Sequence, residues 1–311
     1  MTTKYVYISS LPRSGSTLLS MLLGSHEKIF SPGEFVLFGQ ALQSNSTCTC
    51  GKPIRECDFW GFIIEKLTQQ GFTGKQENGG NFVTLVYPFE FMKSRLQKSL
   101  IKLYYYALLH HSRFLIDIAT ANRKGYPYHM KKAVTNSTIL LENLYQYFPD
   151  PDTIILDASK TVTTLNHLYI KQPFPVKVIA LIRDGRGSVN SWLKSDQTSF
   201  IDTVKSWQFH METQQKSLKG IKAGDKIFVR YEDLCRNPEG ELKRLCDFLE
   251  IPYQGKMLAM EGPFHMLGGN PGTYASTKTI RLDNGWACSF DKEQLTLFDE
   301  LAGSLNKELG Y

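Results

Sequence analysis

The sequence has few of the features that mark membrane-anchored or disulfide-stabilised proteins. It holds 6 cysteines among 311 residues, and no stretch approaches the roughly 18 apolar residues that a membrane span needs. The nearest approach, Leu18 to Leu23, is broken by Gly24 and His26. The first residues also lack the basic flank and apolar core of a secretory signal. We therefore expect no membrane span, a cytoplasmic location and reduced cysteines.

A strong excess of one charge is also missing. The chain carries 36 Lys and Arg against 30 Asp and Glu, a net charge of +6, and the basic residues are dispersed. Proteins that bind nucleic-acid backbones gather their basic residues into patches or stripes. We therefore expect a small anionic ligand, and neither a nucleic-acid nor a membrane partner.

What the sequence does contain is a series of short β-branched runs, each followed by a helical pattern. These runs are Lys4 to Ser9, Thr153 to Leu156, Val176 to Ile182 and Lys226 to Val229. Strands of a buried parallel sheet read as continuous apolar runs, and alternation with helices is typical of βαβ units. The predicted fold class is therefore α/β, a central parallel β-sheet flanked by helices.

The stretch between the first two of these strands has a different pattern. It contains a polar segment rich in Gly and Asn around residues 75–81, and helical periods over Phe91 to Ala121 and Ser137 to Phe148. We predict a single domain over residues 1–311, with a mainly helical insertion over residues 35–151.

The strongest local signal is the turn between the first strand and its helix, Pro12-Arg13-Ser14-Gly15-Ser16-Thr17. Small residues at a helix N-terminus let backbone N–H groups surround an anion, and Arg13 adds positive charge. An ordinary Ser-capped turn is the alternative interpretation. The nucleotide triphosphatase loop does not fit, because it requires a Lys where this sequence has Ser16.

Residues 12–19, Pro-Arg-Ser-Gly-Ser-Thr-Leu-Leu, resemble the 5′-phosphosulfate loop of sulfotransferases that use 3′-phosphoadenosine 5′-phosphosulfate (PAPS). A second segment, beginning at Arg183, resembles that family's 3′-phosphate element, in which a strand-end Arg is followed eight residues later by a Ser, here Ser191. The resemblance covers Lys4 to Glu34 and Thr153 to Phe290. It implies the P-loop-like sulfotransferase fold.

The resemblance implies transfer of a sulfuryl group from PAPS to a hydroxyl or amine, which leaves adenosine 3′,5′-bisphosphate (PAP). The residues that it implies for binding PAPS are Arg13, Ser14, Gly15, Ser16, Thr17, Arg183, Ser191, Tyr231, Ser276, Lys278 and Arg281. Judged without the family, Tyr231 is equally well explained as a core residue.

Three of the matched residues are candidates for catalysis. In the bacterial and tyrosylprotein branches of the family a Glu at the position of Glu34 acts as the base, and a Lys at that of Lys160 contacts the transferring group. Arg13 adds charge beside it. Taken alone, Glu34 reads as an exposed turn carboxylate and Lys160 as a solvated amine. His129 is the alternative base, and no metal is required for the reaction.

The implied acceptor is a small molecule, including secondary metabolites, or a carbohydrate, and the insertion over residues 35–151 is expected to shape its pocket. Two other classes stay open. One is an ATP-dependent small-molecule kinase, which the missing loop Lys disfavours. The other is a nucleotide-binding module without catalysis, which the intact set of candidate residues disfavours.

Three cysteines, Cys48, Cys50 and Cys57, lie within one short segment. Zinc or a disulfide would explain such a concentration. Zinc needs four ligands, however, and no fourth Cys or His is close in the sequence. We therefore expect free thiols there ahead of either alternative.

Overall fold

In the computed structural model, the described residues are 5–72, 138–162, 165–166, 169, 175–195, 198–269 and 279–311. Most of the predicted insertion, including its helical period over residues 91–121 and His129, lies outside the described residues. So do Ser276 and Lys278.

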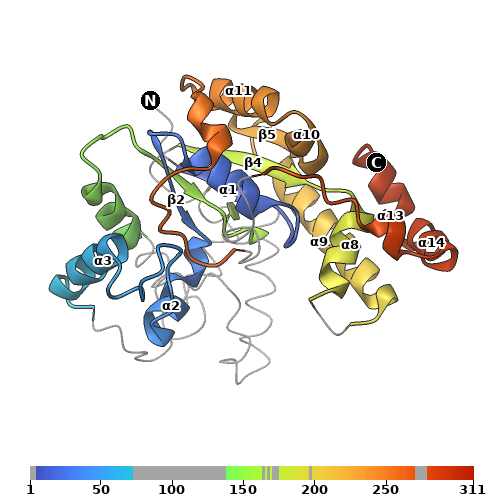
Figure 1. The fold of residues 1–311 in the computed structure, drawn as a ribbon, viewed down its shortest axis with the longest axis horizontal. Coiled ribbons are helices and arrows are strands. Elements are labelled where there is room, and N and C mark those ends of the chain that lie inside the picture. The colour runs from blue at the N-terminus through green and yellow to red at the C-terminus, as the bar shows by residue number, and fades with distance from the viewer. Residues whose placement is uncertain are drawn as a thin grey trace.

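One sheet of five parallel strands forms the centre of the molecule, in the order β2-β3-β1-β4-β5 (Figure 1). The strands are β1 (Tyr5–Ser9), β2 (Ile29–Gly33), β3 (Ile154–Asp157), β4 (Val176–Ile182) and β5 (Lys226–Arg230). The predicted α/β class is confirmed. Because β1 lies in the middle, with β3 on one side and β4 on the other, the chain reverses its direction of winding there. In open α/β sheets, ligands bind at such a switch point.

The sequence predicted four of these five strands, each to within about one residue, but not β2. Its sequence, Ile-Phe-Ser-Pro-Gly, ends in residues that favour turns. The sheet order explains why it is nevertheless a strand. Since β2 is an edge strand, Pro32 does not have to donate a hydrogen bond to a second neighbour.

Helices cover the sheet and extend beyond one end of it. They are α1 (Ser16–Gly24), α2 (Phe38–Ser44), α3 (Asp58–Gln69), α8 (Gly185–Leu193), α9 (Phe200–Lys219), α10 (Tyr231–Arg236), α11 (Pro238–Leu249), α13 (Trp286–Ser289) and α14 (Lys292–Glu308), with 3-10 helices η1 (Phe35–Leu37), η3 (Ala223–Asp225) and η4 (Gly255–Ala259). Residues 138–147 are also helical. Within the described residues, none of the helices is both long enough and apolar enough to cross a membrane.

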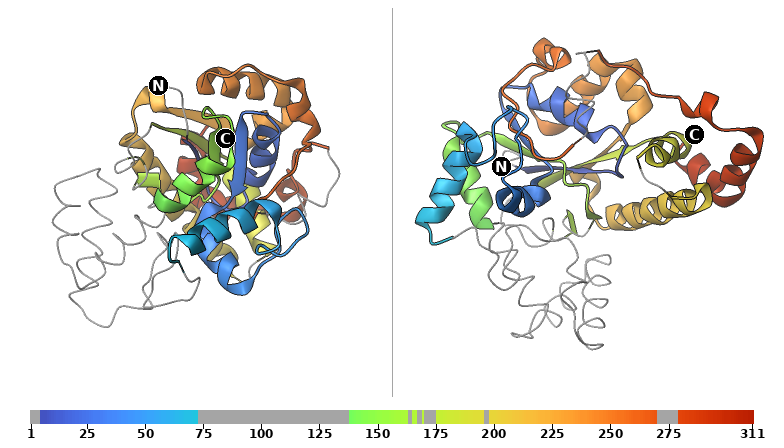
Figure 2. Two further views of the ribbon diagram at one scale, coloured as in Figure 1. Left: turned by 90° about the vertical axis from the view of Figure 1, so that its left-hand side faces the viewer. Right: turned by 60° about the horizontal axis from the view of Figure 1, so that its bottom comes forward.

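The two faces of the sheet bury different clusters, because successive side chains of a strand point to opposite faces. Tyr5 and Tyr7 of β1 pack with α2, α3, residues 138–147 and the end of α9. Val6 and Ile8 pack instead with α1, α11 and η4. Figure 2 shows α1 and α11 on one side of the sheet and α9 on the other. Each fully buried aliphatic side chain of these clusters contributes about 1.5–3 kcal/mol.

A third cluster joins α8, α9 and α14 at the end of β4. The side chain of Asp184 caps α8 by accepting a hydrogen bond from the N–H of Arg186 at 2.9 Å. The side chain of Asn306 on α14 accepts a second from the N–H of Gly185 at 2.8 Å. These contacts fix the start of α8, and with it the backbone that follows Arg183.

The described parts of the predicted insertion contain helices joined by loops, with an isolated bridge between Thr47 and Pro53. The helices are η1, α2, α3 and residues 138–147. Phe59 of α3 packs edge-on against Tyr147, with ring centroids 4.9 Å apart, so α3 and residues 138–147 lie side by side (Figures 1 and 2).

Candidate active site

Each of the five strands is followed, directly or within a short loop, by a residue that the sequence singled out. These residues are Arg13 after β1, Glu34 after β2, Lys160 after β3, Arg183 after β4 and Tyr231 after β5. Since the carboxyl ends of parallel strands lie along one edge of the sheet, all five residues gather on that edge.

The loop after β1 ends in a helix N-terminus with no side-chain cap. Helix α1 begins at Ser16, and its N-cap residue Gly15 has a φ of 90°. The hydroxyl of Ser14 is buried and has no hydrogen-bond partner within the described residues. The alternative of a Ser-capped turn is therefore wrong. Uncapped N–H groups and a buried hydroxyl fit an anion at this helix end.

Gly15 also allows a close contact between this loop and Tyr231. A Cβ atom at position 15 would lie 2.4 Å from Cδ2 of the Tyr231 ring. Only glycine fits there, because both the positive φ and the ring exclude a side chain. Tyr231, which is 6% exposed, thus packs beneath the loop as well as in the core.

Arg13 and Lys160 have an unusual backbone conformation in common. Their φ angles are 63° and 68°, in the left-handed region that few residues other than glycine adopt. Such conformations are strained and concentrate at functional sites. Both residues are candidates for contact with the transferring group, so the strain lies where the sequence predicts the chemistry.

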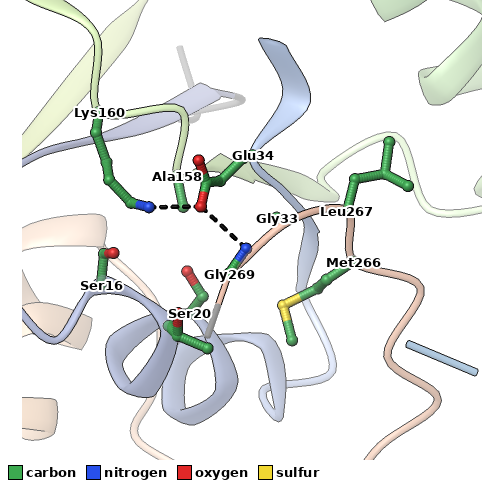
Figure 3. A pocket seen from close by; sticks show the side chains of 10 residues that line it. Ser16, Ser20, Gly33, Glu34, Ala158, Lys160, Met266, Leu267 and Gly269 are labelled. Carbon is green, nitrogen blue, oxygen red and sulfur yellow. Dashed lines mark hydrogen bonds and ion pairs between the residues drawn. The ribbon is translucent and has the colours of Figure 1, made fainter. Parts of the chain in front are cut away.

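The carboxylate of Glu34 receives two contacts on a single oxygen. Oε1 lies 2.5 Å from Nζ of Lys160 and accepts a hydrogen bond from the N–H of Gly269 at 2.9 Å (Figure 3). The side chains of Glu34 and Lys160 are only 21% and 13% exposed. The pair lines a pocket that Ser16 and Ser20 of α1 also line, so it faces the helix N-terminus.

Glu34 is held in place through its own backbone. Its N–H donates to the carbonyl of Leu267 at 2.8 Å, and the N–H of Leu267 donates to the carbonyl of Pro32 at 2.8 Å. Gly33, with a φ of 75°, makes this approach feasible, because a Cβ there would lie 2.4 Å from the Leu267 carbonyl oxygen. The segment around Leu267 therefore positions the candidate base.

Lys160 is positioned by a buried turn after β3. Asp157 accepts hydrogen bonds from the Tyr5 hydroxyl at 2.7 Å and from the N–H and hydroxyl of Ser159. The hydroxyl of Ser159 accepts one from the N–H of Val36 at 2.9 Å. Burial raises the pKa of Asp157 to about 6, although the hydrogen bonds from Ser159 and Tyr5 oppose that change. This turn joins the ends of β2 and β3.

Arg183 connects the phosphate loop to the segment after residue 280. Its guanidinium donates to the carbonyl of Arg13 at 2.8 Å, and to the carbonyl and the carboxylate of Asp283 at 2.7 and 3.0 Å. It also stacks over the ring of Tyr231, 4.5 Å from the centroid. Only its buried Nε lacks a partner among the described residues.

The Arg183 guanidinium lowers the pKa of the Asp283 carboxyl group. Burial alone would raise the pKa of Asp283, but hydrogen bonds from Arg183 and from the N–H of Gly285 outweigh it and lower that pKa. No motif or spacing in the sequence singled out Asp283. An anion bound at this guanidinium would compete with the Asp283 carboxylate for it.

The remaining predicted cofactor residues lie in different surroundings. Ser191 lies in the last turns of α8 and is half-buried. Arg281 has an exposed side chain, and its carbonyl accepts a 3.3 Å hydrogen bond from the hydroxyl of Tyr231. Its backbone therefore reaches the site, whereas Ser276 and Lys278 lie outside the described residues. Gly269 is a further contact that sequence reasoning missed.

Comparison with known protein families identifies the family to which a chain with these strand-end residues belongs. A profile described as "Sulfotransferase family" matches residues 6–255. The chain belongs to the sulfotransferase family. The resemblance drawn from residues 12–19 and from the Arg183 segment, to PAPS-dependent sulfotransferases, is thereby confirmed at the level of the family.

Individual relatives of this sulfotransferase chain are distant. Protein-tyrosine sulfotransferase A of Caenorhabditis elegans is 22% identical over 268 residues, which cover 84% of this chain and 53% of that protein. Protein-tyrosine sulfotransferase 1 of Danio rerio is 33% identical over 110 residues, 32% of this chain and 30% of that protein. The chain thus spans about half the length of the first relative, and the match to the second is shorter.

Two solved structures have the same fold as this sulfotransferase. The sulfotransferase domain of the Synechococcus PCC 7002 olefin synthase has a TM-score of 0.52 at 18% identity, and covers 97% of this chain and 96% of that one. The sulfotransferase domain from the curacin biosynthetic pathway has a TM-score of 0.51 at 20% identity, with 98% of both chains covered. The predicted P-loop-like sulfotransferase fold is confirmed.

Cys48, Cys50 and Cys57, which the sequence singled out, lie close together outside the pocket of this sulfotransferase chain. All six cysteines are free thiols, so the disulfide alternative is not what the structure contains. The reason for setting zinc aside was wrong, because His265 lies beside Cys48, Cys50 and Cys57. Its place more than 200 residues along the chain hid it from inspection of the sequence.

Proposed function

We propose that this chain transfers the sulfuryl group of PAPS to a hydroxyl or amine of a small molecule, including secondary metabolites, or of a carbohydrate. The observation that carries the proposal is the position of the Glu34–Lys160 pair. It lines one pocket with the uncapped N-terminus of α1, so that a carboxylate, an ammonium group and this helix end face the same space.

The residues of the donor site fit PAPS at two places. At the first, the N-terminus of α1 has no side-chain cap and lies beside the buried Ser14 hydroxyl and the residues Ser16 and Thr17, and it suits a 5′-phosphosulfate. At the second, Arg183 keeps a buried Nε–H without a partner among the described residues, and suits the 3′-phosphate. Tyr231 lies between the two, in contact with both Gly15 and Arg183.

When bound, PAPS supplies an activated sulfuryl group whose leaving group is a phosphate. Glu34 Oε1 is occupied by Lys160 and Gly269, so its Oε2 is the atom that takes the proton from the acceptor hydroxyl or amine. The new bond joins the acceptor oxygen or nitrogen to sulfur, and the bond from sulfur to the phosphate oxygen breaks. Lys160 and Arg13 balance the negative charge of this in-line transfer.

We propose that residues 1–311 form a single domain. Within it, we propose that the insertion over residues 35–151 shapes the pocket that binds the acceptor. Its described beginning, η1 and α2, directly follows Glu34. An acceptor held by this region would therefore lie close to Glu34. The protein-tyrosine sulfotransferases among the relatives make a tyrosyl peptide the natural competing acceptor to test.

Calorimetric titration with PAP, ATP and 5′-AMP, without added metal, tests the donor site. We expect binding of PAP that needs its 3′-phosphate. Binding of ATP alone, and only with Mg²⁺, would favour the kinase alternative.

Transfer of labelled sulfate from PAPS to a panel of phenols, sugars, amines and an acidic tyrosyl peptide then identifies the acceptor class. Binding of PAP without transfer to any of them would favour a non-catalytic module.

A further inference from the structure

Three cysteines and one histidine from two distant segments meet beside the start of α3. The three sulfurs and a ring nitrogen of Cys48, Cys50, Cys57 and His265 all lie within 4.8 Å of one another. Cys57 Sγ lies 3.7 Å from Cys48 Sγ and 3.2 Å from Nδ1 of His265, and Cys48 Sγ lies 4.0 Å from that nitrogen. Such a set of ligand atoms occurs where a protein binds a soft metal ion.

These separations fit a tetrahedral zinc ion better than a disulfide. Bonds of about 2.3 Å to sulfur and about 2.0–2.1 Å to nitrogen place tetrahedral ligands roughly 3.8 Å apart for two sulfurs and roughly 3.5 Å apart for sulfur and nitrogen. The separations of 3.2–4.0 Å lie around these values. A disulfide would need sulfurs about 2.05 Å apart. We propose that Cys48, Cys50, Cys57 and His265 bind one zinc ion.

The backbone around the cysteines is arranged to present their sulfurs. A tight turn brings the N–H of Gly51 to the carbonyl of Cys48 at 2.9 Å, and the φ of 87° at Gly51 suits glycine. The N–H of Cys48 donates to the carbonyl of Lys52 at 2.9 Å. Cys57 is the N-cap residue of α3 and makes no side-chain cap. The turn and the start of α3 therefore bring the three sulfurs to one place.

The histidine is held at the cysteines by contacts that do not involve its ring nitrogens. The indole of Trp60 donates to the carbonyl of His265 at 2.8 Å. Thr49, between two of the cysteines, donates to the carbonyl of Phe264 and accepts from the N–H of Met266, both at 2.8 Å. His265 is thus fixed from both of its chain neighbours.

The proposed zinc site is structural in type. It would also help to position Glu34, because His265 belongs to the segment whose backbone bonds to Glu34. All four positions around the ion would be filled by protein ligands, which is the mark of structural zinc, and none of the four lines the Glu34 pocket. His265 lies two residues before Leu267, whose backbone bonds to Pro32 and Glu34, and four before Gly269, which bonds to Glu34 Oε1. By binding both His265 and the cysteine loop, the ion would fix residues 265–269 in place and so restrict the position of Glu34, the candidate base.

Elemental analysis of the full-length protein, purified under reducing conditions without chelators, tests the proposal. We expect about one zinc per chain, and in the Cys50→Ser protein less than about a fifth of that. Cys50 is the ligand to change first, because its side chain is exposed and the variant should keep the fold. Cys288→Ser, an exposed thiol on α13, is the matched control and should keep its zinc.

Replacement of the metal by Co²⁺ tests the ligand set even if zinc is lost during purification. We expect the intense visible bands of tetrahedral Co²⁺ and a near-ultraviolet band from thiolate coordination, both absent from Cys50→Ser and weakened in His265→Ala. Wild-type protein that carries no zinc and gives no such spectrum with Co²⁺ would overturn the proposal. So would four titratable thiols instead of six in a second preparation that is purified and unfolded without reductant, which would mean a disulfide.

Discussion

The ammonium group of Lys160 lies 2.5 Å from Oε1 of Glu34, although the two residues follow different strands, β3 and β2. Neighbouring strands bring them together, since β2 and β3 pair directly and Gly33 lies opposite Asp157. Because both contacts of the carboxylate, with Lys160 and with Gly269, are made by Oε1, the proposed mechanism assigns the acceptor proton to Oε2 of Glu34. The two residues therefore divide the proposed chemistry, with proton transfer at Glu34 and charge balance at Lys160.

Replacement of Glu34 by Gln tests the proposed base. We expect kcat to fall on the order of 10²- to 10⁴-fold, because the amide cannot take the acceptor proton. The affinity for PAP should stay nearly unchanged, since the proposed phosphate contacts lie at α1 and Arg183. The measurements are steady-state kinetics and PAP calorimetry on the same preparation.

Glu27→Gln is the control for that experiment. The side chain of Glu27 is exposed and lies 3.8 Å from Lys256, away from the Glu34 pocket, so its replacement should leave kcat unaltered. Turnover of Glu34→Gln within a few-fold of wild type would remove Glu34 from the role of base.

Two substitutions at Lys160 separate its chemistry from its backbone strain. Lys160→Gly and Lys160→Ala both remove the amine, and kcat should fall equally, on the order of 10²- to 10³-fold. Their stabilities should differ. Because Lys160 has a φ of 68°, glycine is free of strain there and alanine is not, so the Gly protein should be more stable by about 1 kcal/mol.

Chemical denaturation of the two Lys160 proteins measures that difference. Equal stability would mean that the left-handed conformation at residue 160 carries no strain. Equal stability together with near-normal turnover would mean that neither the amine nor its unusual backbone contributes to function.

The fold was readable from the sequence largely because its inner strands are short apolar runs. Four strands and the loop before α1 carry local signals, and the ends of those strands carried Arg13, Lys160 and Arg183. Edge strand β2 gave no such signal, since its Pro and Gly are typical of turns. Glu34 was found only through the family resemblance, because an isolated carboxylate after Pro-Gly has no distinguishing pattern.

The contacts that sequence reasoning missed all join segments far apart in the chain. Gly269 meets Glu34 across 235 positions, and His265 meets Cys57 across 208. No periodicity or spacing predicts which distant loops touch, because that depends on how the segment around residues 264–269 packs against β2 and α3. Asp283 was missed for the same reason, since it meets Arg183 across 100 positions.

Replacement of Arg183 and of Asp283 should change PAP affinity in opposite directions. Arg183→Ala should weaken binding by roughly 1.5 to 3 kcal/mol, the scale of a lost charged hydrogen bond. Asp283→Asn should tighten it by roughly two- to fivefold, because the carboxylate competes with a phosphate for the guanidinium and lies at a half-exposed site.

Calorimetry with PAP at fixed ionic strength measures both effects, with Arg244→Ala, an exposed Arg paired with Glu241, as the control. If Asp283→Asn weakened binding as much as Arg183→Ala, Asp283 would hold Arg183 in position instead of competing for it. Unchanged affinity in Arg183→Ala would exclude Arg183 from the donor site.

The buried Asp157 should make stability fall as the pH rises from about 4 to about 6. Its folded pKa is raised to about 6 by burial, whereas an unfolded Asp titrates near about 3.9. Within that window the folded chain keeps a proton that the unfolded chain releases, so the free energy of unfolding decreases with rising pH. At about 1.4 kcal/mol for each pKa unit, the loss is up to about 3 kcal/mol.

Asp157→Asn removes this titration, because the amide has no proton to lose, yet its oxygen can still accept from Ser159. Denaturant unfolding at several pH values across the window measures the difference between wild type and variant. The wild type should lose stability relative to the variant as the pH rises through about 6, and the exposed control Asp247→Asn should follow the wild type. Parallel profiles for wild type and Asp157→Asn would mean that Asp157 is ionised in the folded chain throughout the window, stabilised by Tyr5 and Ser159.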